Sequence, residues 1–178
     1  MTSENLIFRP ATEHDICAIA AIYDTIIDRE TTVGRRTGWQ KGIYPTAATV
    51  RTALAAGDMF AAEQAGRICA AARLNREQVP VYDDCRWQFA APPEQVFVIH
   101  TLVVDPACSG QGIASRFLAF YEQMARDKGC TVLRLDTNEI NLPARSLYAK
   151  HDYREAGCLP CEFNGIPGVQ LVCIEKKL

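Results

Sequence analysis

The sequence contains no apolar run that approaches the roughly 20 residues needed to cross a bilayer. It also has no large excess of one charge, since 19 Lys and Arg stand against 21 Asp and Glu. A dedicated nucleic-acid-binding protein usually has a strongly basic surface, so that class of protein is disfavoured. A local basic patch is still compatible with the balanced charge. We therefore expect neither a membrane nor a nucleic acid as a partner.

The sequence also lacks repeats, low-complexity tracts and linkers rich in Pro, Gly or Ser. The first 15 residues are polar and contain no apolar signal-peptide segment, which predicts a cytoplasmic protein. Hydrophobic residues make up 48% of the 178 residues, enough for a core without disulfides or a structural metal. We expect a single domain over residues 1–178.

The eight cysteines are the unusual part of the composition. In the reducing cytoplasm most of them should stay thiols. Four lie in apolar runs, where cysteine packs as a small hydrophobic side chain: Cys17, Cys69, Cys130 and Cys173.

Cys158 and Cys161 have the spacing of half a zinc site. A structural zinc site needs four ligands and no second pair exists, so no metal is expected. A redox pair should open a helix, whereas this one lies in a predicted loop between two strands. Together with Cys108, which precedes a glycine-rich turn, these two thiols stay candidates for oxidation sensing or for lining a site.

Hydrophobic periodicity predicts about seven strands and four helices. The predicted strands cover residues 6–9, 59–64, 67–74, 96–104, 131–136, 153–156 and 169–175. The predicted helices cover residues 15–28, 47–56, 112–128 and 142–150. This mixed alternation is typical of an α/β or α+β fold with a mixed sheet.

A glycine-rich turn joins the predicted strand 96–104 to the predicted helix 112–128. Gly110 and Gly112 leave backbone N–H groups accessible, and the first turn of the helix adds unpaired amides and a positive dipole end. Such a turn suits a phosphate. Taken alone, a glycine pair is more often only a connection between a strand and a helix.

Two common nucleotide-binding motifs fit this turn poorly. A P-loop needs a Gly-Lys-Ser/Thr ending, and no lysine is present here. A dinucleotide fingerprint could use Gly110 and Gly112, with Asp136 for the ribose. However, Ser115 occupies the position of the third glycine of that fingerprint. In addition, residues 105–109 separate the strand from the first glycine, which should follow it almost directly. A nicotinamide-linked oxidoreductase is therefore the weaker alternative.

The wider context of the turn resembles the GCN5-related N-acetyltransferase (GNAT) superfamily. The acyl-CoA loop of that family has the form Gln/Arg-x-x-Gly-x-Gly/Ala after a strand that ends in Leu-x-Val. The corresponding segments here are Leu102-Val103-Val104 and Ser109-Gly110-Gln111-Gly112-Ile113-Ala114. Gly112 and Ala114 match the pattern, and Ser109 replaces the Gln or Arg.

A second block about thirty residues downstream strengthens the resemblance. The family signature Asn-x-x-Ala-x-x-Leu-Tyr-x-Lys-x-Gly-Phe appears here from Asn141 to Tyr153. Asp152 replaces the glycine and can adopt the same left-handed backbone, and Tyr153 replaces the phenylalanine. Two blocks in this order are far more specific than either one alone.

The resemblance implies a GNAT-type, mostly antiparallel sheet and acetyl-CoA as co-substrate. The pantetheine arm would lie beside Leu102–Val104, the pyrophosphate on the amides of Gln111 to Ser115, and Asn141 would contact the cofactor. The implied cofactor-binding residues are Leu102, Val103, Val104, Ser109, Gly110, Gln111, Gly112, Ile113, Ala114, Ser115 and Asn141. Homodimers are common in this family, but nothing in the sequence requires one.

Acetyl transfer to an amine requires that the ammonium lose a proton and that the departing thiolate gain one. The resemblance points Tyr148 at the sulfur as general acid, with core packing as its alternative role. His100, in a run similar to that of arylalkylamine acetyltransferases, is the candidate base, with a buried structural histidine as the alternative. Asp136 is a second proton acceptor, or else a helix cap or ion-pair partner.

The acceptor pocket should come from the irregular segments 28–45, 75–95 and 157–168. Five aromatic residues could line it: Trp39, Tyr44, Tyr82, Trp87 and Phe89. Asp83, Asp84 or Glu162 could hold a cationic amine, whereas Arg35 and Arg36 could hold an acidic acceptor. We predict an N-acetyltransferase acting by direct attack on a primary amine of a small molecule or peptide. The alternative is a non-catalytic acyl-CoA sensor or interaction module.

Overall fold

A computed structural model describes residues 5–178, which form one seven-stranded sheet in the order β1-β2-β3-β4-β5-β7-β6. The strands are β1 (Ile7–Pro10), β2 (Met59–Gln64), β3 (Arg67–Asn75), β4 (Val96–Val104), β5 (Val132–Asn138), β6 (Arg154–Phe163) and β7 (Ile166–Lys177). The α-helices are α1 (Ile16–Val33), α2 (Ala47–Ala55), α3 (Ile113–Asp127) and α4 (Leu142–Lys150). The prediction of a mixed, mostly antiparallel sheet of about seven strands with four helices is confirmed.

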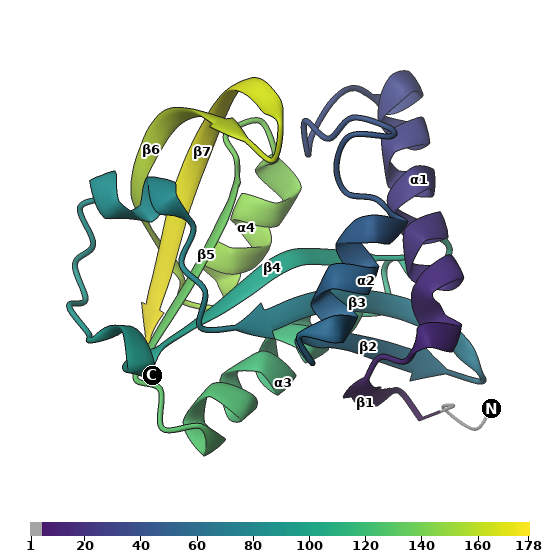
Figure 1. Cartoon of the computed structure of the whole chain (residues 1–178), viewed down its shortest axis with the longest axis horizontal. Helices are drawn as coiled ribbons and strands as arrows, with labels where there is room; N and C mark the ends of the chain where they lie inside the picture. Colours follow the sequence, from purple (N-terminus) through teal and green to yellow (C-terminus); the bar gives the residue numbers. More distant parts are fainter. Residues whose placement is uncertain (1–4) are drawn as a thin grey trace.

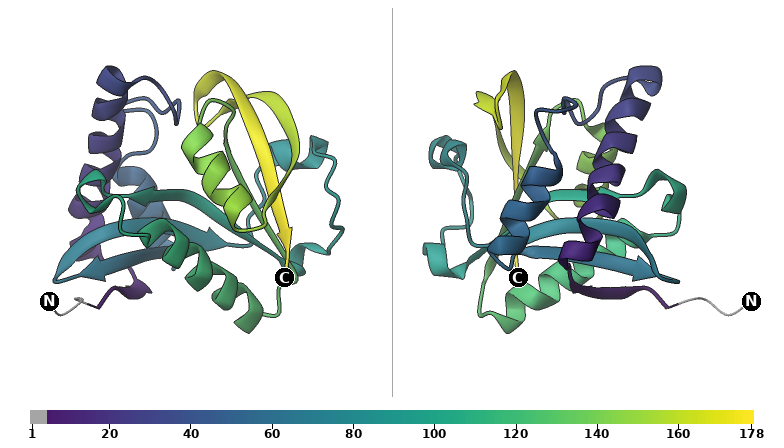
Figure 2. Two further views of the ribbon diagram at one scale, coloured as in Figure 1. Left: turned by 180° about the vertical axis from the view of Figure 1, so that it is seen from behind. Right: turned by 45° about the vertical axis from the view of Figure 1, so that its right-hand side comes forward.

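Two helical layers cover the sheet. Helices α1 and α2 lie on one face and α3 and α4 on the other, as Figures 1 and 2 show from three sides. The layer under α1 and α2 buries Ile19, Tyr23 and Val50 against β2, β3 and β4. The layer under α3 and α4 buries a larger set: Phe97, Phe117, Leu118, Tyr121, Leu133, Leu135 and Tyr148. The glycine-rich turn and the predicted Tyr148 therefore belong to the second layer.

Helix α1 is longer than its hydrophobic pattern predicts. A capping box precedes the helix, in which the Thr12 amide donates to Asp15 Oδ2 at 2.7 Å. The helix then continues to Val33 instead of ending near residue 28. Its last turn is polar, and a tertiary contact stabilises it: the buried Glu30 accepts the Thr37 amide at 2.8 Å.

The prediction of a loop over residues 157–168 is wrong. Strand β6 continues to Phe163 and β7 begins at Ile166, with a tight turn at Asn164 and Gly165, both of which have positive φ. Pro160 and Gly157 weaken the strand pattern in the sequence. Pro160 is tolerated because β6 is an edge strand of the sheet, where alternate N–H groups face away from the neighbouring strand.

The centre of the sheet splits open between β4 and β5, its single parallel pair in the described chain. Their pairing joins Val96–Val98 to Val132–Arg134 and then stops. Beyond that point the two strands diverge (Figure 1). On its other side β4 stays paired with β3, but the register shifts opposite Thr101, whose φ of 55° is unusual for a β-branched residue. Residues 99–104 of β4 therefore present a free edge to the split.

The structure changes the interpretation of three cysteines. Cys17 is exposed on the outer face of α1, so the prediction that it packs in the core is wrong. Cys158 is exposed and Cys161 half-buried in β6, where alternate residues face opposite sides, so they lie in a strand and not in a loop. Burial raises the pKa of both thiols, which disfavours the reactive thiolate.

All eight cysteines are free thiols. Among residues 5–178 no cluster of three His, Cys, Asp or Glu side chains is placed to hold a metal ion. No helix within the same residues is both long and apolar enough to span a membrane.

A titration of the native protein with a chromogenic thiol reagent tests the packing of the cysteines. Cys17 and Cys158 should react fast because they are the exposed thiols, and Cys161 more slowly. The other five should react after denaturation only. Replacing Cys17 and Cys158 by Ser should remove the fast phase, and a fast phase that includes the buried thiols would contradict this core.

Candidate active site

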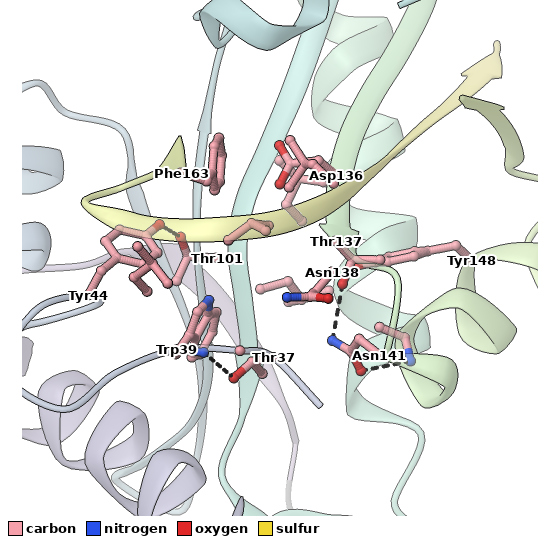
Figure 3. Close-up of a pocket in the computed structure, with 17 residues that line it drawn as sticks. Thr37, Trp39, Tyr44, Thr101, Asp136, Thr137, Asn138, Asn141, Tyr148 and Phe163 are labelled. Carbon is pink, nitrogen blue, oxygen red and sulfur yellow. Dashed lines mark hydrogen bonds between the residues drawn. The ribbon is translucent and has the colours of Figure 1, made fainter. Parts of the chain in front are cut away.

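A small cavity of about 100 Å³ lies where β4 and β5 diverge, and we call it the central cavity. Residues from β4, β5, α4, β7 and the segment between α1 and α2 line it. Figure 3 shows Tyr44 and Thr101 on one side and Tyr148 on the opposite side. A second cavity of about 430 Å³, the lateral cavity, lies beside it toward α2. Tyr44, Thr101, Asp136 and Phe163 line both, so the two cavities meet at these residues.

Asp136 is the most strongly perturbed carboxyl group of the site. It lies on the diverging part of β5 and accepts a hydrogen bond from the Tyr82 hydroxyl at 2.7 Å. Its surroundings desolvate the charged form, and this burial raises its pKa to about 6, although the Tyr82 bond acts in the opposite direction. The expected cap or ion-pair role is not observed among the described residues. A carboxyl group with this pKa can gain and lose a proton near neutral pH.

Tyr148 faces the central cavity from α4 and is 7% exposed. Burial raises the pKa of its phenol, and the negative charge of Asp136 adds to the effect. The hydroxyl therefore keeps its proton at neutral pH. Its ring packs against Tyr153 with 6.0 Å between centroids, which restrains the direction of the side chain.

Asn141 connects β5 with α4 at the edge of the central cavity. Its Oδ1 accepts the Ala144 amide at 3.4 Å and so caps the helix, while its Nδ2 donates to Thr137 Oγ1 at 3.1 Å. These two contacts position the start of the helix that carries Tyr148. The structure thus gives Asn141 a structural role in addition to its place in the cavity wall.

The glycine-rich turn has the backbone of an anion site. Gly110 and Gly112 have φ of 80° and 69°, and a Cβ at either position would meet no atom within 4 Å. The glycines are therefore needed for the backbone conformation and not for space. None of the amides of residues 112–115 donates a hydrogen bond to another residue of the described chain. Together these amides and the positive end of α3 can bind a phosphate.

Ser115 ties this turn to the end of α4. Its hydroxyl lies 2.9 Å from His151 Nε2. The carbonyl of His151 in turn accepts Lys176 Nζ from β7 at 2.9 Å. The N-terminus of α3 and the C-terminus of α4 are thus held together beside the split.

Thr101 and Tyr44 form the boundary between the two cavities. The Tyr44 hydroxyl and Thr101 Oγ1 are 2.6 Å apart. Thr101 keeps its positive φ within a strand, a strained conformation that surrounding contacts must hold in place. Sequence reasoning placed Tyr44 in the pocket but did not identify Thr101.

His100 lies in the wall of the lateral cavity. Its Nε2 is 3.0 Å from Asn75 Oδ1. Burial lowers its pKa to about 4, and the positive charge of Arg73 adds to this effect. The imidazole is therefore neutral at neutral pH. It can accept a proton from this side, but it is a weaker base than an unperturbed histidine.

The five aromatic residues predicted to line the acceptor pocket divide into two groups. Trp39 and Tyr44 line the central cavity. Tyr82, Trp87 and Phe89 instead pack in a separate cluster on β4, β5 and β7, which corrects the prediction for these three. Tyr82 still contributes through its bond to Asp136.

The charged residues predicted to meet the acceptor do not line either cavity. The acidic and basic candidates are all exposed: Asp83, Asp84, Glu162, Arg35 and Arg36. Arg73 and Glu77 line the lateral cavity in their place. No local sequence pattern identifies Arg73, because only the register of β3 with β4 pairs it with His100.

Comparison with known proteins relates this arrangement to one family. A model of the acetyltransferase (GNAT) family matches residues 21–153. A GNAT-family acetyltransferase structure from Streptococcus agalactiae has a TM-score of 0.81 at 18% identity, over 97% of this chain and 95% of its own. A ribosomal-protein-alanine N-acetyltransferase from Brucella melitensis has a TM-score of 0.70 at 21% identity, over 97% and 100%. A putative acetyltransferase from Salmonella typhimurium, solved with acetyl-CoA, has a TM-score of 0.66 at 18% identity, over 98% and 94%. No curated protein matches the chain significantly.

Replacing Asp136 by Asn should change how stability depends on pH. Burial raises the pKa of this carboxyl group from 3.8 to about 6 in the folded protein. The associated stabilisation is therefore fully present below about pH 4 and is lost as the pH rises through about 6. As the pH rises from about 4 to 6, the free energy of unfolding of Asp136→Asn should therefore increase relative to that of the wild type, on the order of 2 kcal/mol.

Thermal unfolding at pH 4 and pH 7.5 measures this difference. The exposed Asp83→Asn is the matched control and should leave the pH dependence unchanged. Equal effects of Asp136→Asn at both pH values would contradict the raised pKa.

Proposed function

The chain belongs to the acetyltransferase (GNAT) family, which uses acetyl-CoA, and from this membership we propose an N-acetyltransferase that acts on a primary amine of a small molecule or peptide. The observation that carries the proposal is the pairing of Asp136 and Tyr148 around one cavity in the split of the sheet. Their environments give one group a pKa near neutrality and keep the other protonated. Such a pair can serve as base and acid.

The residues of the split fit acetyl-CoA. The amides of Gln111 to Ser115 would hold the pyrophosphate, and the free edge of β4 at Leu102–Val104 would run beside the pantetheine arm. Asn141 and Tyr148 line the central cavity, where the thioester would lie. These contacts come mostly from the backbone. They therefore do not depend on the side chain at position 109, where this chain has Ser109 and the family loop usually has Gln or Arg.

The chain's own groups can move both protons of the reaction. Asp136 takes the proton from the acceptor ammonium, and the resulting amine attacks the thioester carbonyl carbon. A C–N bond forms and the C–S bond breaks, with the electron pair leaving on sulfur. Tyr148 donates its proton to that thiolate. His100 is the other candidate base, from the lateral cavity, but its lower pKa makes Asp136 the better acceptor.

Gly112→Ala and Gly57→Ala make a matched pair that tests the phosphate-binding role of the turn. Both glycines have φ near 70° with open space around the Cβ position, so each substitution should cost ~1 kcal/mol of stability. Gly112 alone lies at the proposed pyrophosphate site. By calorimetry, Gly112→Ala should bind CoA about tenfold more weakly, since relaxation of the strain redirects its amides, and Gly57→Ala should bind it normally. Equal affinity of the two variants would remove the support for this site.

Substitutions of the acid and the two candidate bases test the chemistry. Tyr148→Phe should lower kcat about 100-fold or more while acetyl-CoA affinity stays unchanged. In the wild type, kcat should rise with pH through an apparent pKa near 6, and Asp136→Asn should remove this limb. His100→Gln should retain it.

Thiol release over pH 5–9 with an amine panel provides the readout. Loss of the limb in His100→Gln alone would assign the base to His100. An unchanged kcat in Tyr148→Phe would contradict its role as acid. CoA binding without transfer to any amine would favour the non-catalytic sensor.

A further inference from the structure

The charges around the lateral cavity distinguish between classes of acceptor. We infer that this cavity selects cationic amines that carry no carboxylate, an inference that rests on the proposed acetyl transfer. The acceptor amine reaches the thioester at the junction of the two cavities, where Asp136 lies. The rest of the acceptor then occupies the lateral cavity.

One positive side chain lines the lateral cavity, and it is already neutralised. Arg73 Nη2 donates to Glu77 Oε2 at 2.6 Å and lies 3.4 Å from Asp58 Oδ2. Glu77 and Asp136 also line the cavity. Because His100 is neutral, the cavity wall carries one cation and two carboxyl groups, and a third carboxyl group, Asp58, contacts that same cation. The field in the cavity therefore favours a positively charged ligand.

A hydrogen-bond network holds Arg73 in this internal role. Asn75 Nδ2 donates to Asp58 Oδ2 at 2.8 Å, and Asn75 Oδ1 lies 3.0 Å from His100 Nε2. Of the guanidinium nitrogens, Nε is buried and Nη2 already contacts Glu77 and Asp58, so an acceptor could reach only Nη1, beside these carboxylates. Asn75 thus orients the Asp58 carboxylate toward Arg73, and Glu77 makes the shorter contact with the guanidinium.

An acceptor carboxylate would meet an unfavourable environment in this cavity. It would have to displace Glu77 from Arg73, or share the guanidinium with Glu77 while it remains close to that carboxylate and to Asp136. Either outcome places like charges together in a partly desolvated space, which weakens binding. An ammonium group meets Asp136 at the junction and Glu77 near the rim, so both charges favour it.

Matched acceptor series test the inference directly. Each series contains an amino acid, its methyl ester and the corresponding decarboxylated amine, for tyrosine, phenylalanine, leucine and lysine. The ester amine is less basic than that of the acid, and the decarboxylated amine is more basic. A preference for both over the acid therefore reports the carboxylate and not amine basicity. Thiol release with mass spectrometry of the products should give kcat/KM at least tenfold higher for ester and amine, mainly through KM.

Variants of two glutamates identify the source of the selection. Glu77→Gln should reduce the ratio of kcat/KM for the ester to kcat/KM for the acid several-fold, because it lowers KM for the acid. Glu94→Gln, an exposed substitution outside the residues that line the cavity, should keep the wild-type ratio. Melting temperatures of both variants verify folding.

Three results would overturn the inference. If the acids react as well as their esters and amines, this inference is overturned while the proposed acetyl transfer stands. The same holds if folded Glu77→Gln leaves the kcat/KM ratio of ester to acid unchanged. Absence of transfer to every member of the series, with CoA still raising the melting temperature, would overturn the proposed acetyl transfer and this inference with it.

Discussion

The parallel pairing of β4 with β5 ends at Val98 and Arg134, and the rest of the molecule is arranged around that interruption. A sheet that opens in its centre exposes backbone groups that need partners, so such an opening is sustained only where other elements hold the strands apart or a ligand completes the ladder. The shift of register at Thr101 turns β4 on one side, and its contact with Tyr44 holds that turn. On the other side, antiparallel pairing with β7 along its whole length keeps β5 straight.

The sequence predicts well those elements whose own residues determine them. Strand β4, helix α3 and helix α4 have strong periodicity and clear ends, and all three form as expected. The glycine-rich turn also follows from local chemistry, because positive φ at Gly110 and Gly112 is a property of the backbone there. Both strands of the β6–β7 hairpin were predicted, but not their extension across residues 157–168. Pro160 is tolerated there because β6 is an edge strand, and edge position is a property of the whole sheet.

The site was predicted less completely, for the same physical reason. Motif matching located Tyr148 and Asn141 in the wall of the central cavity. The perturbed state of Asp136 depends on Tyr82, which is 54 residues away, and on burial that no local pattern expresses. The pairing of Arg73 with Glu77 becomes relevant to an acceptor only after strand register brings both to the lateral cavity. Charges that looked available in the sequence lie on the outer surface instead.

The contact between Ser115 and His151 has a mechanical consequence. It joins the turn that presents free amides to the helix that carries Tyr148, and Lys176 fastens the same point to the sheet. These contacts couple the start of α3 to the end of α4 and both to β7, so a displacement of one helix is expected to disturb the other. A ligand that orders the amide turn would therefore also restrict the motion of the Tyr148 side chain.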